Sequence, residues 1–113
     1  MAVIKRLKDD NGVLYETKKK LPDKYYGDLL ATLAELEDND CHRQHRFPHT
    51  ELHKLKGLGK SVGDIYECYI HKISGWRFQV SYTADGYIAL LNISDAEEHD
   101  RIDKVVKSKK NSF

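Results

Sequence analysis

The alternation of apolar and polar side chains between residues 64 and 93 predicts three consecutive β-strands. Residues 76–82 show it most clearly, so one face of this strand should be core and the other should carry polar groups. The polar positions of this run are Arg77, Gln79 and Ser81. Residues 64–71 alternate in the same way. Residues 87–93 are almost continuously apolar, which is typical of a strand buried on both faces in mid-sheet.

Two turn signals separate these runs. Ser74-Gly75 follows the first run and Asp85-Gly86 follows the second. Glycine accepts the positive φ that tight turns require, and Asp-Gly is a strong hairpin signal. The three runs are therefore expected to be antiparallel neighbours.

A helix is expected before the strands. Leu21-Pro22-Asp23 marks its start, because proline suits the first helical position and aspartate suits the positive end of the helix dipole. Apolar residues then recur at helical spacing over about four turns. They are Tyr26, Leu29, Leu30, Leu33 and Leu36. This stripe should cover the apolar face of the sheet.

A second helix is expected after the strands. Ser94-Asp95-Ala96-Glu97 has the form of a capping box, in which the serine hydroxyl caps an early amide and the glutamate reaches back. The apolar stripe that follows consists of Ile102, Val105 and Val106. The sequence thus predicts a C-terminal helix that closes one end of the sheet.

The remaining segments give weaker signals. Residues 2–7 predict a short edge strand, and Asn11-Gly12 predicts a turn. Residues 13–17 fit either a returning strand or a helical turn. Residues 38–50 are polar and contain Pro48, so we expect a loop there.

These elements fit one small domain. With 113 residues the chain is long enough for a single core. The expected fold class is α+β: residues 1–113 form an antiparallel sheet of three to four strands, with one long helix packed on one face and a C-terminal helix. No apolar run approaches the roughly 20 residues of a membrane helix, and the basic N-terminus lacks the apolar segment of a signal peptide. We therefore expect a cytoplasmic protein with no membrane partner.

Charge and cysteine content exclude few classes of function. The net charge of +1, from 19 basic and 18 acidic residues, gives no overall case for nucleic-acid binding. Basic residues do gather before the first predicted strand, at Lys54, Lys56 and Lys60. They form either a local basic surface or ordinary solvated charge. Cys41 and Cys68 are expected to be reduced thiols.

The segment around residues 38–53 is rich in histidine and begins near a cysteine. The residues are Cys41, His42, His45, His49 and His53. Imidazole and thiolate are zinc ligands, but this spacing matches no closed four-ligand pattern, and Pro48 prevents one helix from aligning the side chains. We therefore predict no metal and no cofactor.

The ordered set of short motifs from residue 22 to residue 106 resembles a known family. A helix is followed by "ELHKLKG", "IYECYI", "GWRFQV" and "GYIALLNIS". This order is similar to the RelE/ParE superfamily of bacterial toxin–antitoxin systems, in its RelE, YoeB and HigB branches. Members usually begin with a strand and a two-helix hairpin, whereas this chain has room for little more than one long helix.

The resemblance implies a ribosome-dependent endoribonuclease, or mRNA interferase, that is neutralised by a cognate antitoxin. Its partners would be the ribosome and mRNA. Such an enzyme cuts by attack of the ribose 2′-hydroxyl on the adjacent phosphate, which requires a base, a cation on the phosphorane and an acid. Arg77 matches the arginine of the family and lies on the polar face beside Glu67 and Tyr69.

The resemblance also suggests the other roles. Glu51 or Glu67 would serve as the base and His99 as the acid. Lys54, Lys56 and Lys60 would hold flanking phosphates, and Tyr69 would stack on a base. In the RelE branch, however, two lysines occupy the positions of Glu67 and Tyr69, and a later arginine corresponds roughly to Glu97.

Structural roles are open for the same residues. Arg77 would then pair with Glu67, His99 would pack beside Ile102, and Tyr69 would be a sheet aromatic. Two further function classes also stay open. One is a catalytically inactive or gyrase-targeting member of the same fold, and the other is a small phage-type interaction module.

Overall fold

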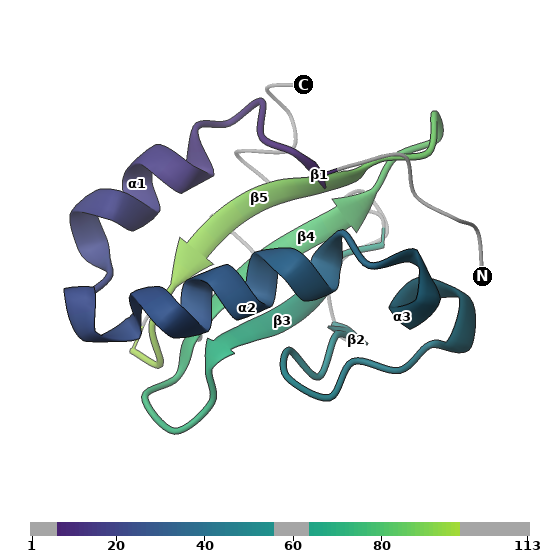
Figure 1. The fold of residues 1–113 in the computed structure, drawn as a ribbon. Helices are drawn as coiled ribbons and strands as arrows, with labels where there is room; N and C mark the ends of the chain where they lie inside the picture. Colours follow the sequence, from purple (N-terminus) through teal and green to yellow (C-terminus); the bar gives the residue numbers. More distant parts are fainter. Residues whose placement is uncertain (1–6, 56–63, 98–113) are drawn as a thin grey trace.

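The structure is a computed structural model that describes residues 7–55 and 64–97. This part of the chain is an α+β fold in which helices lie over one face of a mixed five-stranded sheet (Figure 1). The strand order is β1-β5-β4-β3-β2. The strands are β1 (Leu7–Lys8), β2 (His53–Lys54), β3 (Tyr66–His71), β4 (Trp76–Tyr82) and β5 (Ile88–Ser94).

The three strands predicted from alternation are confirmed as β3, β4 and β5, which form an antiparallel meander. Both predicted turns join them, with Gly75 at φ 84° and Gly86 at φ 94°. These positive φ values explain why glycine occupies both positions. Strand β5 is buried along its whole length and lies between β1 and β4, as expected of a mid-sheet strand.

The prediction of an antiparallel sheet with three to four strands is wrong in two respects. Strand β1 pairs in parallel with β5, so the sheet is mixed. Strand β2 adds a fifth strand at the opposite edge by pairing antiparallel with β3. Each of these edge strands has two residues, which is too short to carry an alternation pattern. The N-terminal strand was expected at residues 2–7, of which the structure describes Leu7.

For residues 13–17 the sequence allowed either a strand or a helical turn. In the structure they belong to the helix α1 (Val13–Lys20). Gly12 precedes it with a left-handed φ of 68°. The Asp9 carboxylate accepts the amides of Val13 and Leu14 at 2.7 and 2.9 Å. It thus satisfies amides of the first turn that have no partner within the helix.

The single long helix expected from Pro22 is shorter and less regular. A 3₁₀ turn (Asp23–Tyr25) leads into α2 (Tyr26–Leu36), which packs on β3. Of the predicted stripe, Leu36 is fully buried, and Leu29 and Leu33 pack against the core. The other two positions are wrong, because Tyr26 is 39% exposed and Leu30 is 67% exposed.

The loop expected at residues 38–50 contains a short helix, α3 (Asn39–Gln44). The Asp38 side chain caps it by accepting the Asp40 amide at 2.9 Å. His42 from this helix is fully buried, and its ring nitrogens lie 2.7 Å from the Tyr82 hydroxyl and 2.7 Å from the Leu36 carbonyl. A six-residue helix that buries a histidine shows no apolar periodicity in sequence, which is why the pattern indicated a loop.

The predicted capping box does not form around Ser94. This residue ends β5, and its hydroxyl lies 3.0 Å from the Gln79 amide nitrogen. The Glu97 amide donates instead to the Asp95 carboxylate at 3.0 Å. The C-terminal helix itself was predicted for residues outside the described part. Among the helices within residues 7–55 and 64–97, none is long and apolar enough to cross a membrane.

From one buried thiol and one half-buried phenol we predict that stability falls at alkaline pH. Burial raises the pKa of the Cys68 thiol above its ordinary value of 9.0. Burial, together with the neighbouring Tyr66 and Cys68, raises the pKa of the Tyr82 phenol above its ordinary 10.0. Above these ordinary values the unfolded chain releases protons that the folded chain retains, so unfolding becomes easier as pH rises.

Urea unfolding should therefore give a free energy that declines between about pH 8.5 and pH 11, by up to ~1.4 kcal/mol per pH unit for each group. Cys68→Ala should reduce the steepness of the decline, although its small cavity lowers stability at every pH. Tyr82→Phe should do the same at the upper end of the range. A free energy that stays constant across this range would contradict the assignment.

Candidate active site

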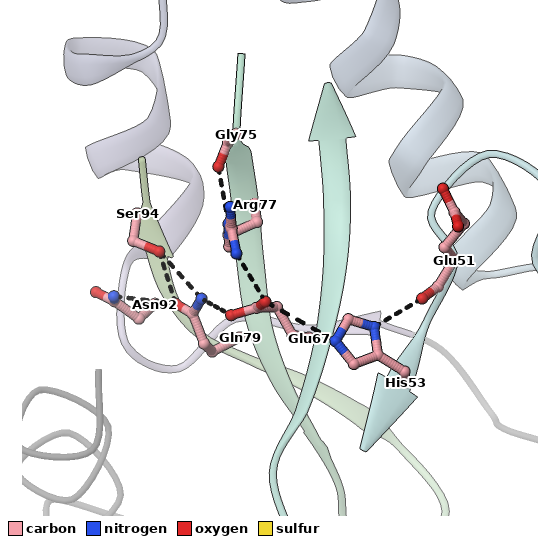
Figure 2. A network of polar contacts seen from close by, with 8 residues as sticks. All are labelled: Glu51, His53, Glu67, Gly75, Arg77, Gln79, Asn92 and Ser94. Carbon is pink, nitrogen blue, oxygen red and sulfur yellow. Dashed lines mark hydrogen bonds and ion pairs between the residues drawn. The ribbon is translucent and has the colours of Figure 1, made fainter. Parts of the chain in front are cut away.

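A continuous network of polar side chains crosses the sheet on the face opposite α2. It joins four strands, from β2 through β3 and β4 to β5 (Figure 2). We call it the polar network. Its side chains are His53, Glu67, Arg77, Gln79, Asn92 and Ser94. Sequence alternation placed Arg77 and Gln79 on this face, and the register Glu67↔Gln79 brings the acid beside them.

Glu67 is the centre of the polar network. Its side chain is 2% exposed. One carboxylate oxygen accepts from Arg77 Nη1 at 3.0 Å, and the other accepts from Gln79 Nε2 at 3.0 Å. Because a buried carboxylate is costly unless it is paired and hydrogen-bonded, these donors hold the negative charge in place.

Gly75, Tyr69 and Glu67 all contact the Arg77 side chain. Its Nε donates to the Gly75 carbonyl at 2.8 Å, which ties the guanidinium to the β3–β4 turn. Its guanidinium carbon lies 5.2 Å from the centre of the Tyr69 ring, directly across the strand pair. The side chain is 11% exposed. The expected ion pair with Glu67 is thus present, and so is the expected position beside Tyr69.

His53 places an exposed imidazole next to this ion pair. Its side chain is 47% exposed, and its Nε2 lies 3.9 Å from the Glu67 carboxylate. Nδ1 lies 2.9 Å from the Glu51 carbonyl. Because a carbonyl oxygen can only accept a hydrogen bond, Nδ1 carries the proton. In the neutral imidazole, Nε2 therefore presents its lone pair on the side of Glu67.

Helix α2 fixes the segment that leads to His53. The Glu35 carboxylate accepts the amides of His49 and Thr50 at 3.0 and 2.9 Å, and also the Thr50 hydroxyl at 2.7 Å. The Thr50 carbonyl in turn accepts the Tyr69 amide at 2.8 Å. This tether holds the chain against β3, so that the His53↔Glu67 pair can form in β2.

Glu51, the other carboxylate expected as a base, does not join this cluster through its side chain. Its carboxylate lies 2.8 Å from Lys72 Nζ, which raises the pKa of that lysine. Figure 2 shows the Glu51 side chain directed away from His53, while its main-chain carbonyl faces the imidazole. In this structure Glu51 contributes a backbone acceptor to the site.

Of the three lysines expected to bind RNA, the described residues include Lys54. Lys54 lies on β2 opposite Tyr66, so its side chain is on the other face of the sheet from Glu67 and Arg77. Its Nζ lies 3.1 Å from the Asp64 carboxylate. Lys56, Lys60 and His99 lie outside the described residues.

The histidines of the histidine-rich segment have different hydrogen-bond partners and do not come together. His42 is bound in the core, as described above. His49 Nε2 lies 3.0 Å from the Thr32 hydroxyl and 3.2 Å from the Asp28 carbonyl. Within residues 7–55 and 64–97, no group of three or more metal-binding side chains comes together.

The sequence did not reveal four members of the polar network. His53 was considered there only as a possible metal ligand, and its pairing with Glu67 depends on a two-residue strand. Gln79 was assigned to the right face without a role. Asn92 and Ser94 are polar residues at the end of a nearly apolar run, which was the available signal. Asn92 Nδ2 donates to the Gln79 side-chain carbonyl at 3.1 Å.

This arrangement offers chemistry suited to a phosphodiester. It brings together an exposed imidazole, a buried carboxylate, a guanidinium and an aromatic ring. A guanidinium matches the geometry of phosphate oxygens, and an imidazole can accept a proton near neutral pH. Comparison of the chain with models of protein families, with curated proteins and with solved structures found no match.

Proposed function

We propose that this chain is an endoribonuclease of the RelE/ParE type that cleaves mRNA on the ribosome by 2′-hydroxyl attack, and that a cognate antitoxin neutralises it. The observation that carries the proposal is the cluster of His53, Glu67, Arg77 and Tyr69 on one face of the sheet. The family resemblance assigns the arginine to the same place, after the glycine that directly precedes β4.

The order of elements also supports a RelE-like fold. The resemblance leads us to expect a strand, two helices and then an antiparallel meander. In the described residues β1 is followed by α1 and α2, and the meander is β3, β4 and β5, with α3 and β2 between α2 and the meander. The two helices therefore fit where the sequence pattern left room for one.

Each side chain has a role in the proposed reaction. His53 Nε2 takes the proton of the 2′-hydroxyl, and the 2′-oxygen forms its bond to phosphorus. Glu67 stabilises the imidazolium that results, since its carboxylate lies 3.9 Å away. Arg77 stabilises the added negative charge of the phosphorane, and Tyr69 stacks on a neighbouring base.

The reaction ends when the bond from phosphorus to the 5′-oxygen breaks. The departing oxygen takes a proton, and the products are a 2′,3′-cyclic phosphate and a 5′-hydroxyl. The resemblance gives the acid role to His99. The structure thus motivates His53 as the base in place of Glu51, whose carboxylate faces Lys72.

Induced expression in bacteria tests the function. The parent should arrest growth, and primer extension should reveal new cuts in the reading frames of messages that are being translated. His53→Gln should remove both effects, whereas His45→Gln, a matched change on α3's C-terminal cap, should retain them. Arrest without RNA cuts, or no arrest by a folded parent, would contradict the proposal.

One observation favours a second function. Glu67 and Arg77 are nearly buried and form an ion pair with each other, as structural ion pairs do. A binding protein with the same fold would need no accessible catalytic group. Such a protein would bind its antitoxin, or a target such as gyrase, without cutting RNA, so the expression experiment separates the two functions.

A further inference from the structure

The solvent-facing side of α2 is apolar along its whole length. Its exposed residues are Tyr26, Gly27, Leu30, Ala31 and Ala34. None of the five is charged, although surface helices normally carry charged residues on the side opposite the core. We call these five residues the outer face. Leu30, at 67% exposure, is at its centre.

Opposite charges lie at the two ends of the outer face. Lys24 precedes α2 by two residues, and Glu37 follows the last residue of the helix. Both are exposed. Their spacing from Gly27 and Ala34 is three residues in each case, which is the spacing of neighbours on one side of a helix. The face therefore has a basic N-terminal end and an acidic C-terminal end.

The outer face is complementary to a second copy of itself that runs in the opposite direction. If two copies of α2 pack antiparallel about a two-fold axis between Leu30 and Ala31, each Leu30 lies against Ala31 of the other copy. Gly27 then faces Ala34, and Lys24 faces Glu37. A two-fold interface requires such self-complementarity, because the same patch is used by both copies.

The side chains of this face also permit close helix packing. A methyl group at Gly27 would have no neighbour within 4 Å, so the surface beside it is open. Small residues at facing positions let two helices approach, while Leu30 supplies the large apolar side chain whose burial favours association. A partner of any other kind would need this same combination of an apolar centre and reversed end charges.

We propose that the chain forms a homodimer through the outer face of α2, with the two helices antiparallel. Helix α2 packs on the core face of the sheet, and the strand registers place the polar network on the opposite face. Dimerisation leaves both polar networks on the outside of the assembly. The dimer is therefore independent of the proposed nuclease function.

Sedimentation of the purified full chain over a wide concentration range tests the dimer. The parent should approach twice the mass of one chain. Leu30→Glu should weaken association by on the order of tenfold or more, because it puts a charge at the centre of the interface. Ile73→Glu is the matched control, since Ile73 is 95% exposed in the β3–β4 turn and the charge change is the same. It should leave the dimer unchanged.

Charge exchange tests the antiparallel arrangement. Lys24→Glu makes both ends of the face acidic, and Glu37→Lys makes both ends basic. Each variant should self-associate about twofold to fivefold more weakly than the parent, as expected for exposed ion pairs. A mixture of the two should form heterodimers, and a chain with both changes should recover the affinity of the parent.

Several results would overturn the proposal. They are a parent that stays monomeric at every concentration, a Leu30→Glu variant with circular dichroism like that of the parent that still dimerises fully, and a charge-exchange mixture that gains no association. The first result would leave the outer face to a different protein. The second would place the interface elsewhere.

Discussion

Replacement of Glu67 by alanine is expected to lower the free energy of unfolding by about 3–5 kcal/mol, the range found when one partner of a buried ion pair is removed. The substitution removes the Glu67 carboxylate from the Arg77 guanidinium, which is 11% exposed. It also leaves the fully buried Gln79 amide without one of its acceptors. Urea unfolding followed by circular dichroism measures the loss.

Two variants separate the charge from the hydrogen bonds. Glu67→Gln keeps an acceptor oxygen and the side-chain volume. It should therefore lower the free energy of unfolding by less than Glu67→Ala does, but by more than a surface substitution does. Glu51→Ala removes a carboxylate that faces the exposed Lys72, and stability should change little. If Glu67→Ala unfolded no more easily than Glu51→Ala, the polar network would not be part of the stable fold.

Replacement of Arg77 by alanine is expected to reduce the rate of mRNA cleavage on purified ribosomes by on the order of 10²–10³-fold, the effect of removing one donor to a developing oxyanion. The guanidinium is positioned by the Gly75 carbonyl and Glu67 and lies beside the exposed His53. His53 and Arg77 both lie near the same oxygen of Glu67. We therefore expect the positive charge of Arg77 to act on a phosphate that contacts His53.

Arg77→Lys and Arg43→Ala are the controls for this prediction. Lysine retains the positive charge but loses the planar fork, so most of the loss should persist. Arg43 pairs with Asp40 on the surface helix α3, and its removal should leave cleavage unchanged. Because Arg77 also stabilises Glu67, every variant must first be shown to be folded. A folded Arg77→Ala variant with the rate of the parent would remove Arg77 from the site.

The meander could be predicted from sequence because its information is local. Strands β3 and β4 alternate over six and seven residues, and Gly75 and Gly86 occupy turn positions with positive φ. The same alternation brought Arg77, Glu67 and Tyr69 to one face, and the strand register confirms that they are neighbours. These features depend on period and turn chemistry, which a single sequence displays.

Features that depend on tertiary contacts could not be predicted. Strands β1 and β2 have two residues each and exist because longer strands offer them an edge. Periodicity gave Leu30 and Leu33 equal weight, yet the side of α2 that packs on the core includes Leu33 and leaves Leu30 exposed. Helix α3 is stabilised by the Asp38 cap and the buried His42, and neither produces an apolar pattern.

The candidate site also combines residues that local sequence patterns revealed with residues that only tertiary contacts bring there. Its arginine and glutamate were visible as polar positions in alternating strands. Its imidazole was not, because His53 reaches Glu67 through the register of β2, which Glu35 and Thr50 fix from a distance in sequence. The buried amide of Gln79 looked like an ordinary polar residue, since alternation gives the face of a side chain and not its burial.

The chemical nature of the cut ends tests the central claim most directly. The purified parent is mixed with ribosomes that are translating a defined message, and the upstream fragments are examined by mass spectrometry. Attack by the 2′-hydroxyl predicts a 2′,3′-cyclic phosphate on the upstream fragment and a 5′-hydroxyl on the downstream one, with no such ends from His53→Gln. An upstream fragment that ends in a free 3′-hydroxyl, or a message left intact by folded parent protein, would contradict the account.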